Sequence, residues 1–214
     1  MKTPSPLVGA VLAASLLVLS ACGTDEPDAE PTRTTSAPTP TASPTTSDAP
    51  SDLPTSSAGL ELSPGAIGPV TVGMTKAEAE ATGLFDVDVT DDGCGTTAPL
   101  TWKAAYQGVD VQTDPDGTVV SLGVRSADGP RTSQGFGVGS TFGELLEVYG
   151  GELSAPEEAG YGQVGVFVQD NDRWLGYLFG EAESIEALDN NMGLKVTFVE
   201  ATQGEKPGLM RDGC

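Results

Sequence analysis

The amino-acid sequence predicts an α+β fold made of two tandem repeats, each a short helix followed by an antiparallel meander of strands. A motif that occurs twice predicts the repeats, stretches of alternating polar and apolar residues predict the strands, and turn signatures separate those stretches. We assign repeat 1 to residues 59–130 and repeat 2 to residues 131–214, and we expect both repeats to form one folded domain.

The repeated motif reads Val-Gly-x-Thr-x-x-Glu and is typical of a helix start. Its threonine and glutamate are Thr75 and Glu78 in the first copy and Thr141 and Glu144 in the second. In a capping box, the threonine hydroxyl accepts a hydrogen bond from the amide of the third helical residue, which is the glutamate. The glutamate carboxylate in turn accepts a hydrogen bond from the amide of the threonine. A glycine at Gly83 and at Gly150 is suited to end each helix.

Alternating sequence after each helix predicts half-buried antiparallel strands. The predicted strands are 85–89, 102–106, 109–113 and 119–125 in repeat 1, and 164–168, 174–179 and 194–199 in repeat 2. Turn signatures occur at residues 114–117 and 170–172. We expect the helices to cover one face of the sheet and to leave the other face partly open.

Residues 1–21 predict a lipoprotein signal peptide. Lys2 precedes an apolar run over residues 7–19, which is too short to span a bilayer as a helix. The ending Leu-Ser-Ala-Cys at Cys22 resembles the bacterial lipobox. That resemblance implies a diacylglyceryl and acyl (palmitate) modification on Cys22 and a lipid anchor on the extracellular face of the cell membrane. The alternative is an ordinary secreted protein with a chance cysteine.

Residues 22–58 join the lipidated cysteine to the domain and predict a disordered tether. Nine Thr, six Ser and seven Pro account for most of the stretch from Gly23 to Ala58. Such a composition cannot bury enough apolar surface to offset its conformational entropy. We therefore expect this segment to hold the domain away from a membrane.

The charge of the chain excludes several classes of function. The net charge of the chain is −21. Residues 59–214 contain eight basic and 25 acidic residues, so they account for −17 of it. So acidic a surface repels nucleic acid. The chain has no histidine, which excludes Ser-His-Asp catalysis and histidine-ligated zinc, and its three cysteines are too few for a four-thiolate zinc site. We predict no catalytic residue, no metal ligand and no cofactor.

Two cysteines remain if Cys22 is lipidated. We predict that Cys94 and Cys214 form a disulfide, because export places them in an oxidising compartment. The alternative is a pair of free thiols, but the two residues are not arranged as Cys-x-x-Cys and no basic residue adjoins Cys94.

The motifs GPVTVGMTKAE, DGTVVSLGV and GFGVGST, which lie between Gly68 and Thr141, carry a family resemblance. The chain resembles uncharacterised secreted lipoproteins of high-GC Gram-positive bacteria. More distantly, its tandem helix-and-sheet unit is similar to beta-lactamase inhibitory proteins and to small outer-membrane assembly lipoproteins. The resemblance implies a binding fold without catalysis, although no inhibitor-specific loop is recognisable.

These observations together predict a lipid-anchored extracytoplasmic binding module whose partner is a protein or an envelope component. Trp102, Tyr106, Trp174 and Tyr177 form a candidate aromatic binding face, with core packing as the alternative for each. One alternative function is an extracellular hydrolase that uses paired carboxylates, such as Asp114 and Asp116. Another is a structural envelope lipoprotein with no tight ligand.

Overall fold

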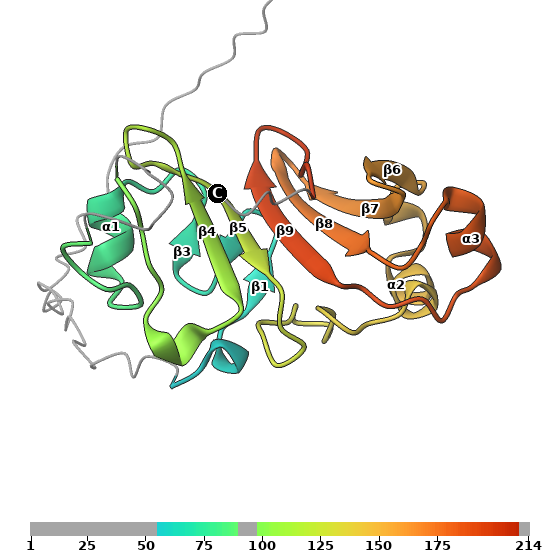
Figure 1. Ribbon diagram of the computed structural model, residues 1–214, viewed down its shortest axis with the longest axis horizontal. Coiled ribbons are helices and arrows are strands. Elements are labelled where there is room, and N and C mark those ends of the chain that lie inside the picture. Colours follow the sequence, from blue (N-terminus) through green and yellow to red (C-terminus); the bar gives the residue numbers. More distant parts are fainter. Residues whose placement is uncertain (1–54, 90–97, 210–214) are drawn as a thin grey trace, which may run out of the picture. The chain divides into compact units, whose positions relative to one another are not determined.

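The fold is α+β, with two antiparallel sheets dominating three short helices among the residues that the structure describes. These residues are 55–89 and 98–209 of the computed structural model, and all of them belong to one compact unit (Figure 1). Cys22, Cys94 and Cys214 lie outside the described residues, as do the predicted signal peptide and most of the predicted tether. No helix in the described ranges is long and apolar enough to cross a membrane.

The larger sheet has six strands. They are β4 (Val109–Thr113), β5 (Val119–Val124), β6 (Glu157–Gly160), β7 (Gln163–Asp170), β8 (Arg173–Phe179) and β9 (Phe198–Gln203). Their order is β4-β5-β9-β8-β7-β6, so the last strand of the chain pairs with a strand from each half. In register, Ala201 of β9 lies opposite Leu122 of β5 on one side and Leu175 of β8 on the other.

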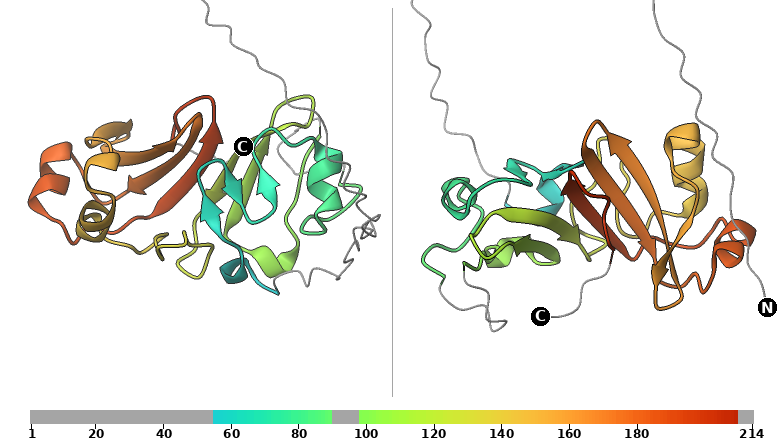
Figure 2. Two further views of the ribbon diagram at one scale, coloured as in Figure 1. Left: turned by 180° about the vertical axis from the view of Figure 1, so that it is seen from behind. Right: turned by 90° about the horizontal axis from the view of Figure 1, so that it is seen from above.

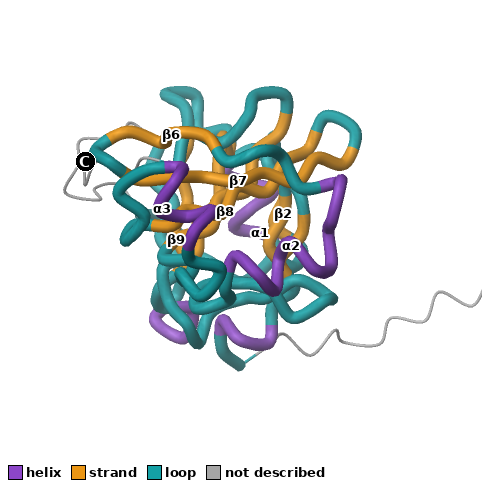
Figure 3. Tube along the Cα trace, turned by 90° about the vertical axis from the view of Figure 1, so that its right-hand side faces the viewer, coloured by secondary structure: helices purple, strands orange, loops and turns teal. Residues whose placement is uncertain are grey.

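Short elements pack against one face of this sheet. They are the three-stranded sheet β1 (Leu62–Ser63), β2 (Ala66–Ile67) and β3 (Val70–Thr71), and the helices α1 (Lys76–Ala81), α2 (Phe142–Tyr149) and α3 (Ile185–Asn190). Figure 2 shows β1 to β3 in front of the large sheet when it is seen from behind. Loops make up much of the remaining chain (Figure 3).

The two faces of the large sheet contribute to two separate apolar clusters. The face toward the helices, the core face, carries Leu122, Val166, Leu175, Tyr177, Phe179, Val199 and Ala201 into the main core. Each helix adds apolar side chains to this core, with Ala79 from α1, Leu145 from α2 and Leu188 from α3. The opposite face, the outer face, carries a smaller cluster of Phe167, Leu178, Phe198 and Leu209.

Three sequence predictions about strands are wrong. Residues 85–89 and 102–106 are not strands, because only Phe85 and Trp102 pair, in an isolated bridge, and residues 104–106 form a 3-10 turn. The last strand covers Phe198–Gln203 instead of 194–199. Strands β1 to β3, strand β6 and helix α3 were not predicted.

The predicted boundary between tether and domain is also wrong by a few residues. Residues Ser57–Gly59 form a 3-10 turn, and the side chain of Ser57 is buried. Leu60, which follows directly, belongs to the main core. The folded part therefore begins before residue 59, because the end of the Ser/Thr-rich segment packs against the domain.

Candidate functional site

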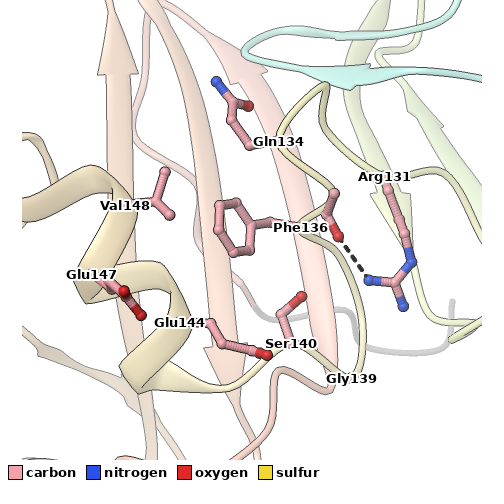
Figure 4. A pocket seen from close by; sticks show the side chains of 9 residues that line it. Arg131, Gln134, Phe136, Gly139, Ser140, Glu144, Glu147 and Val148 are labelled. Atoms are coloured by element: carbon pink, nitrogen blue, oxygen red, sulfur yellow. Dashed lines mark hydrogen bonds between the residues drawn. The ribbon is translucent and has the colours of Figure 1, made fainter.

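A groove of about 350 Å³ lies between α2 and the loop of residues 131–140. Its lining consists of Arg131, Gln134, Gly135, Phe136, Gly139 and Ser140 from the loop, and Glu144, Glu147 and Val148 from α2. Figure 4 shows the ring of Phe136 between the helix and the loop, with Arg131 on the side of the loop away from the helix.

Arg131 fixes the shape of the loop. Its guanidinium donates hydrogen bonds to the carbonyl oxygens of Gly135 at 2.9 Å, Val138 at 3.0 Å and Ala127 at 3.2 Å. Gly135 has a positive φ of 89°, a conformation that favours glycine and lets the loop reverse its direction. Because three of its five N–H donors point to backbone carbonyls, Arg131 acts as a brace for the loop.

Both predicted capping boxes are formed, and the second one stands at the edge of the groove. The Thr141 amide donates to Glu144 Oε2 at 2.8 Å, and the Glu144 amide donates to Thr141 Oγ1 at 3.3 Å. At the start of α1, the corresponding distances between Thr75 and Glu78 are 2.9 Å and 3.3 Å. The box thus holds the Glu144 carboxylate in one position beside the loop.

The hydrogen bonds of the capping boxes lower the pKa of Glu144 and Glu78. For Glu144, the backbone amide and the hydroxyl of Thr141 are the main causes, and the positive charges of Arg131 and Lys195 act in the same direction. For Glu78, the amide and hydroxyl of Thr75 have the same effect. Both groups are therefore ionised at neutral pH, so Glu144 brings a fixed negative charge to the groove.

Replacing both Glu78 and Glu144 by glutamine is expected to make the free energy of unfolding decrease less as the pH is lowered. Because the folded-state pKa of each lies below the ordinary value of 4.5, the ionised form contributes stability above that pH. This contribution is lost as the pH falls through the lowered folded-state pKa. Glutamine still caps the helix but does not titrate. Urea midpoints measured from neutral pH downward should decline less in the double variant, and parallel declines would contradict this linkage.

An aromatic chain connects the floor of the groove to the core. Phe136 is buried and its ring centroid lies 5.4 Å from that of Tyr149. The Tyr149 hydroxyl in turn lies 3.3 Å from the hydroxyl of Tyr177. Burial, together with the neighbouring Tyr149, raises the pKa of Tyr177 far above its ordinary value, so the Tyr177 hydroxyl stays protonated. The floor of the groove is therefore backed by aromatic rings of the core.

The apolar side of the groove includes one exposed side chain of α2. Val148, which lines the groove, is 55% exposed. Glu147 adds a second carboxylate from the same helix. An apolar wall with carboxylates at its edge is suited to bind an apolar group that carries a positive charge.

The predicted aromatic binding face is wrong for three of its four residues. Trp102, Tyr106 and Tyr177 are all buried in the main core, as the core-packing alternative states. Trp102 packs against Phe85 with ring centroids 4.3 Å apart. Trp174 is partly buried and packs against the small cluster on the outer face. The structure does not bring the four side chains together on one exposed surface.

The predicted turn carboxylate of Asp114 stabilises its own turn. Asp114 Oδ1 accepts hydrogen bonds from the amides of Asp116 at 2.9 Å and Thr118 at 2.8 Å, which fixes the hairpin between β4 and β5. In the described part of the chain, no group of three or more carboxylates or thiolates is placed to hold a metal ion.

The groove residues Arg131, Phe136, Glu147 and Val148 were not predicted from the sequence. The sequence feature that could have indicated the groove is the glycine-rich stretch 135–139, which precedes the second capping box. A loop that reverses its direction beside a helix N-terminus can leave a groove between the loop and the helix. The chain matches no protein-family model, and no curated protein or solved structure is significantly similar to it.

Proposed function

We propose that the protein is a lipid-anchored extracytoplasmic binding module without catalytic activity. Cys22 carries the lipid, the Thr/Pro/Ser-rich segment after it tethers the domain to the extracellular face of the cell membrane, and a disulfide joins Cys94 to Cys214. The lipobox-like ending and the Thr/Pro/Ser-rich composition support the anchor and the tether. The acidic domain argues against nucleic acid as the partner.

The observation that carries the binding function is the exposed apolar wall of the groove beside fixed negative charge. Val148, which lines the groove together with Phe136, is 55% exposed, although an apolar side chain of this size is more often buried. Glu144 lies at the same groove with a lowered pKa. We expect the partner to be a protein that presents a basic and an apolar side chain next to each other.

The hydrolase alternative receives no support from this groove. A glycosidase-type general acid needs a carboxyl group whose pKa is raised, usually by burial. The pKa of Glu144 is shifted in the opposite direction, because its ionised form accepts two hydrogen bonds from Thr141. The lowered pKa of Glu144 is therefore more consistent with a binding function of the groove than with hydrolysis.

We further propose that the domain consists of two tandem helix-and-strand repeats, related to the lipoprotein families named above. Corresponding positions of the two motifs make corresponding backbone hydrogen bonds. The Gly73 amide donates to the carbonyl of Val119 at 2.8 Å, and the Gly139 amide donates to the carbonyl of Val196 at 2.8 Å. The Val119 and Val196 amides each donate back to the residue after that glycine, again at 2.8 Å.

The pairing of β5 with β9 supports the same relation. If Val119 corresponds to Val196, then Leu122 corresponds to Val199 and Val124 to Ala201. In register, Leu122 lies opposite Ala201 and Val124 lies opposite Val199. Leu122 thus pairs with the counterpart of Val124, and Val124 pairs with the counterpart of Leu122. The same reciprocal pairing occurs at the self-complementary interface of a two-fold symmetric dimer.

A photo-crosslinking amino acid at position 148 is expected to capture a protein partner in intact envelopes. The matched control carries the same crosslinker at Val87, which is 66% exposed, more than Val148, but lies outside the groove. A discrete adduct at position 148 that is absent at position 87 supports the proposed function. Adding the substitution Phe136→Ala should weaken that adduct, because it removes the floor of the groove.

Identical adducts at positions 148 and 87, or none at 148, would contradict the groove as the binding site. Incubation of the domain with a panel of envelope glycans tests the hydrolase alternative separately. Glycan turnover that disappears on a Glu144→Gln or Glu147→Gln substitution would replace binding by hydrolysis as the function.

A further inference from the structure

The C-terminal segment of residues 204–209 crosses the outer face of the large sheet, on the opposite side from the helices. Within it, Pro207 and Leu209 are buried, whereas residues 204–206 and 208 are exposed. Leu209 joins Phe167, Leu178 and Phe198 in the small cluster that is separate from the main core. The segment thus covers apolar side chains of β7, β8 and β9.

Two glycines of the sheet form the notch into which Leu209 fits. A Cβ atom on Gly165 would lie 2.4 Å from Leu209 Cδ1, and one on Gly176 would lie 2.9 Å from Leu209 Cδ2. The same Cβ on Gly176 would lie 2.9 Å from the Cβ of Pro207. Any larger residue at either position would therefore collide with the segment, so the absence of both side chains creates the space that Leu209 occupies.

A buried carboxylate holds the backbone of the segment. Glu200, on the central strand β9, is 4% exposed, and its Oε2 accepts a hydrogen bond from the Leu209 amide at 2.8 Å. In the sheet, Glu200 lies between Gly123 of β5 and Gly176 of β8. Hydrogen bonds from an amide to a carboxylate are stronger than those between neutral groups, so this contact fixes the register of the segment.

A basic side chain gives the segment its third contact. The ammonium group of Lys206 lies 4.7 Å from the ring centroid of Phe167 and pairs with the carboxylate of Glu157. The segment is therefore recognised by an aliphatic side chain in a notch, by a backbone amide at a buried carboxylate, and by a cation over an aromatic ring. This is the way in which a protein binds a short extended peptide.

The backbone of the segment has features of a bound ligand rather than of a core element. Leu209 has a φ of 57°, in the left-handed region that is unfavourable for a residue with a branched side chain. Residues 204–209 form neither helix nor strand, so their attachment depends on the contacts described above. Segments with strained backbone and few cooperative hydrogen bonds open more readily than the strands beneath them.

We propose that the notch is a second binding site of this protein, for an extended peptide segment that carries a basic residue three positions before an aliphatic residue. The chain's own segment, with Lys206 and Leu209 at these positions, occupies the site as an internal ligand that a partner must displace. The negative charge of the domain favours a partner with such a basic residue. This site is distinct from the groove beside α2, so it can exist whether or not that groove binds a partner.

The test uses the full chain with the substitution Leu209→Asp, which places a negative charge beside Glu200 and vacates the notch. The probe is the synthetic peptide Gly-Glu-Lys-Pro-Gly-Leu, and binding is measured by calorimetry. We expect saturable binding to the variant at least about tenfold tighter than to the wild-type chain, where the internal segment competes. A peptide with Asp in place of Leu should not bind. Adding Gly176→Val to the variant should abolish binding, because the valine fills the notch.

Equal affinity of the peptide for the variant and the wild type, or no binding to a folded variant, would overturn the proposal. If Leu209→Asp prevents folding, amide hydrogen exchange of the wild-type chain decides the question. We expect the Leu209 amide to exchange at least about tenfold faster than the Ala201 amide of β9, because the segment opens without the sheet. Equal protection of the two amides would show that the segment is an integral part of the core and would overturn the proposal.

Discussion

Replacing Phe179 by alanine is expected to lower the free energy of unfolding of the domain by about 3–5 kcal/mol. Phe179 is fully buried on β8, where it faces α2 across the main core. Its ring meets that of Phe142 edge to face, with centroids 5.6 Å apart and planes at 77°. Alanine would leave a cavity between the sheet and the helix that contributes to the groove, and the short helix can close that space only partly.

The matched control for this substitution is Tyr161→Ala. Tyr161 is also aromatic, but it is 86% exposed, so its removal should change the stability by no more than about 0.5 kcal/mol. Urea denaturation of the full chain, followed by circular dichroism, measures both variants. Similar losses in the two variants would contradict the assignment of Phe179 to the main core.

The elements that sequence analysis predicted correctly are those fixed by neighbours in the chain. The capping boxes need only a threonine and a glutamate three residues apart, so their pattern is visible without any tertiary contact. The same holds for the hairpins that join β4 to β5 and β7 to β8. For the first of them, the turn residue Asp114 supplies the hydrogen bonds that reverse the chain.

The last strand shows where this local reasoning fails. The strand predicted over residues 194–199 would carry Leu194, Val196 and Phe198 on one face, because every second side chain of a strand points to the same side. In the structure, Val196 belongs to the main core, whereas Phe198 belongs to the outer cluster. The reason is that Val196 pairs with the second motif, through its amide and the carbonyl of Ser140, before the chain enters the sheet. A change of partner between two residues moves the following side chains to the opposite face.

The groove could not be predicted for a related reason. The sequence identifies Arg131 as a positive charge, but it does not show that the side chain donates to three nearby backbone carbonyls. It identifies Trp102 as a large aromatic side chain, but not that it packs against Phe85 in the core. Whether a side chain is available for a ligand depends on its tertiary partners, and periodicity carries no information about them.

Replacing Ala201 by proline is expected to destabilise both halves of the domain at once. Ala201 lies in β9, between Leu122 of β5 and Leu175 of β8, and is fully buried. Proline cannot donate a ladder hydrogen bond and is not tolerated in the middle of a sheet, with a cost of about 3 kcal/mol or more in regular structure. Because β9 pairs with a strand from each half, the substitution should lower the stability of the first half as well as that of the second half.

The two tryptophans of the chain allow this prediction to be measured, since Trp102 lies in the first half and Trp174 in the second. Two single-tryptophan chains, made with Trp102→Phe or Trp174→Phe, report the unfolding of each half by fluorescence in urea. With Ala201→Pro, both midpoints should fall by a similar amount, whereas Ala155→Pro, at an exposed position outside any strand, should leave both nearly unchanged. A fall in the Trp174 signal alone would mean that the halves are stable independently and that β9 does not couple them.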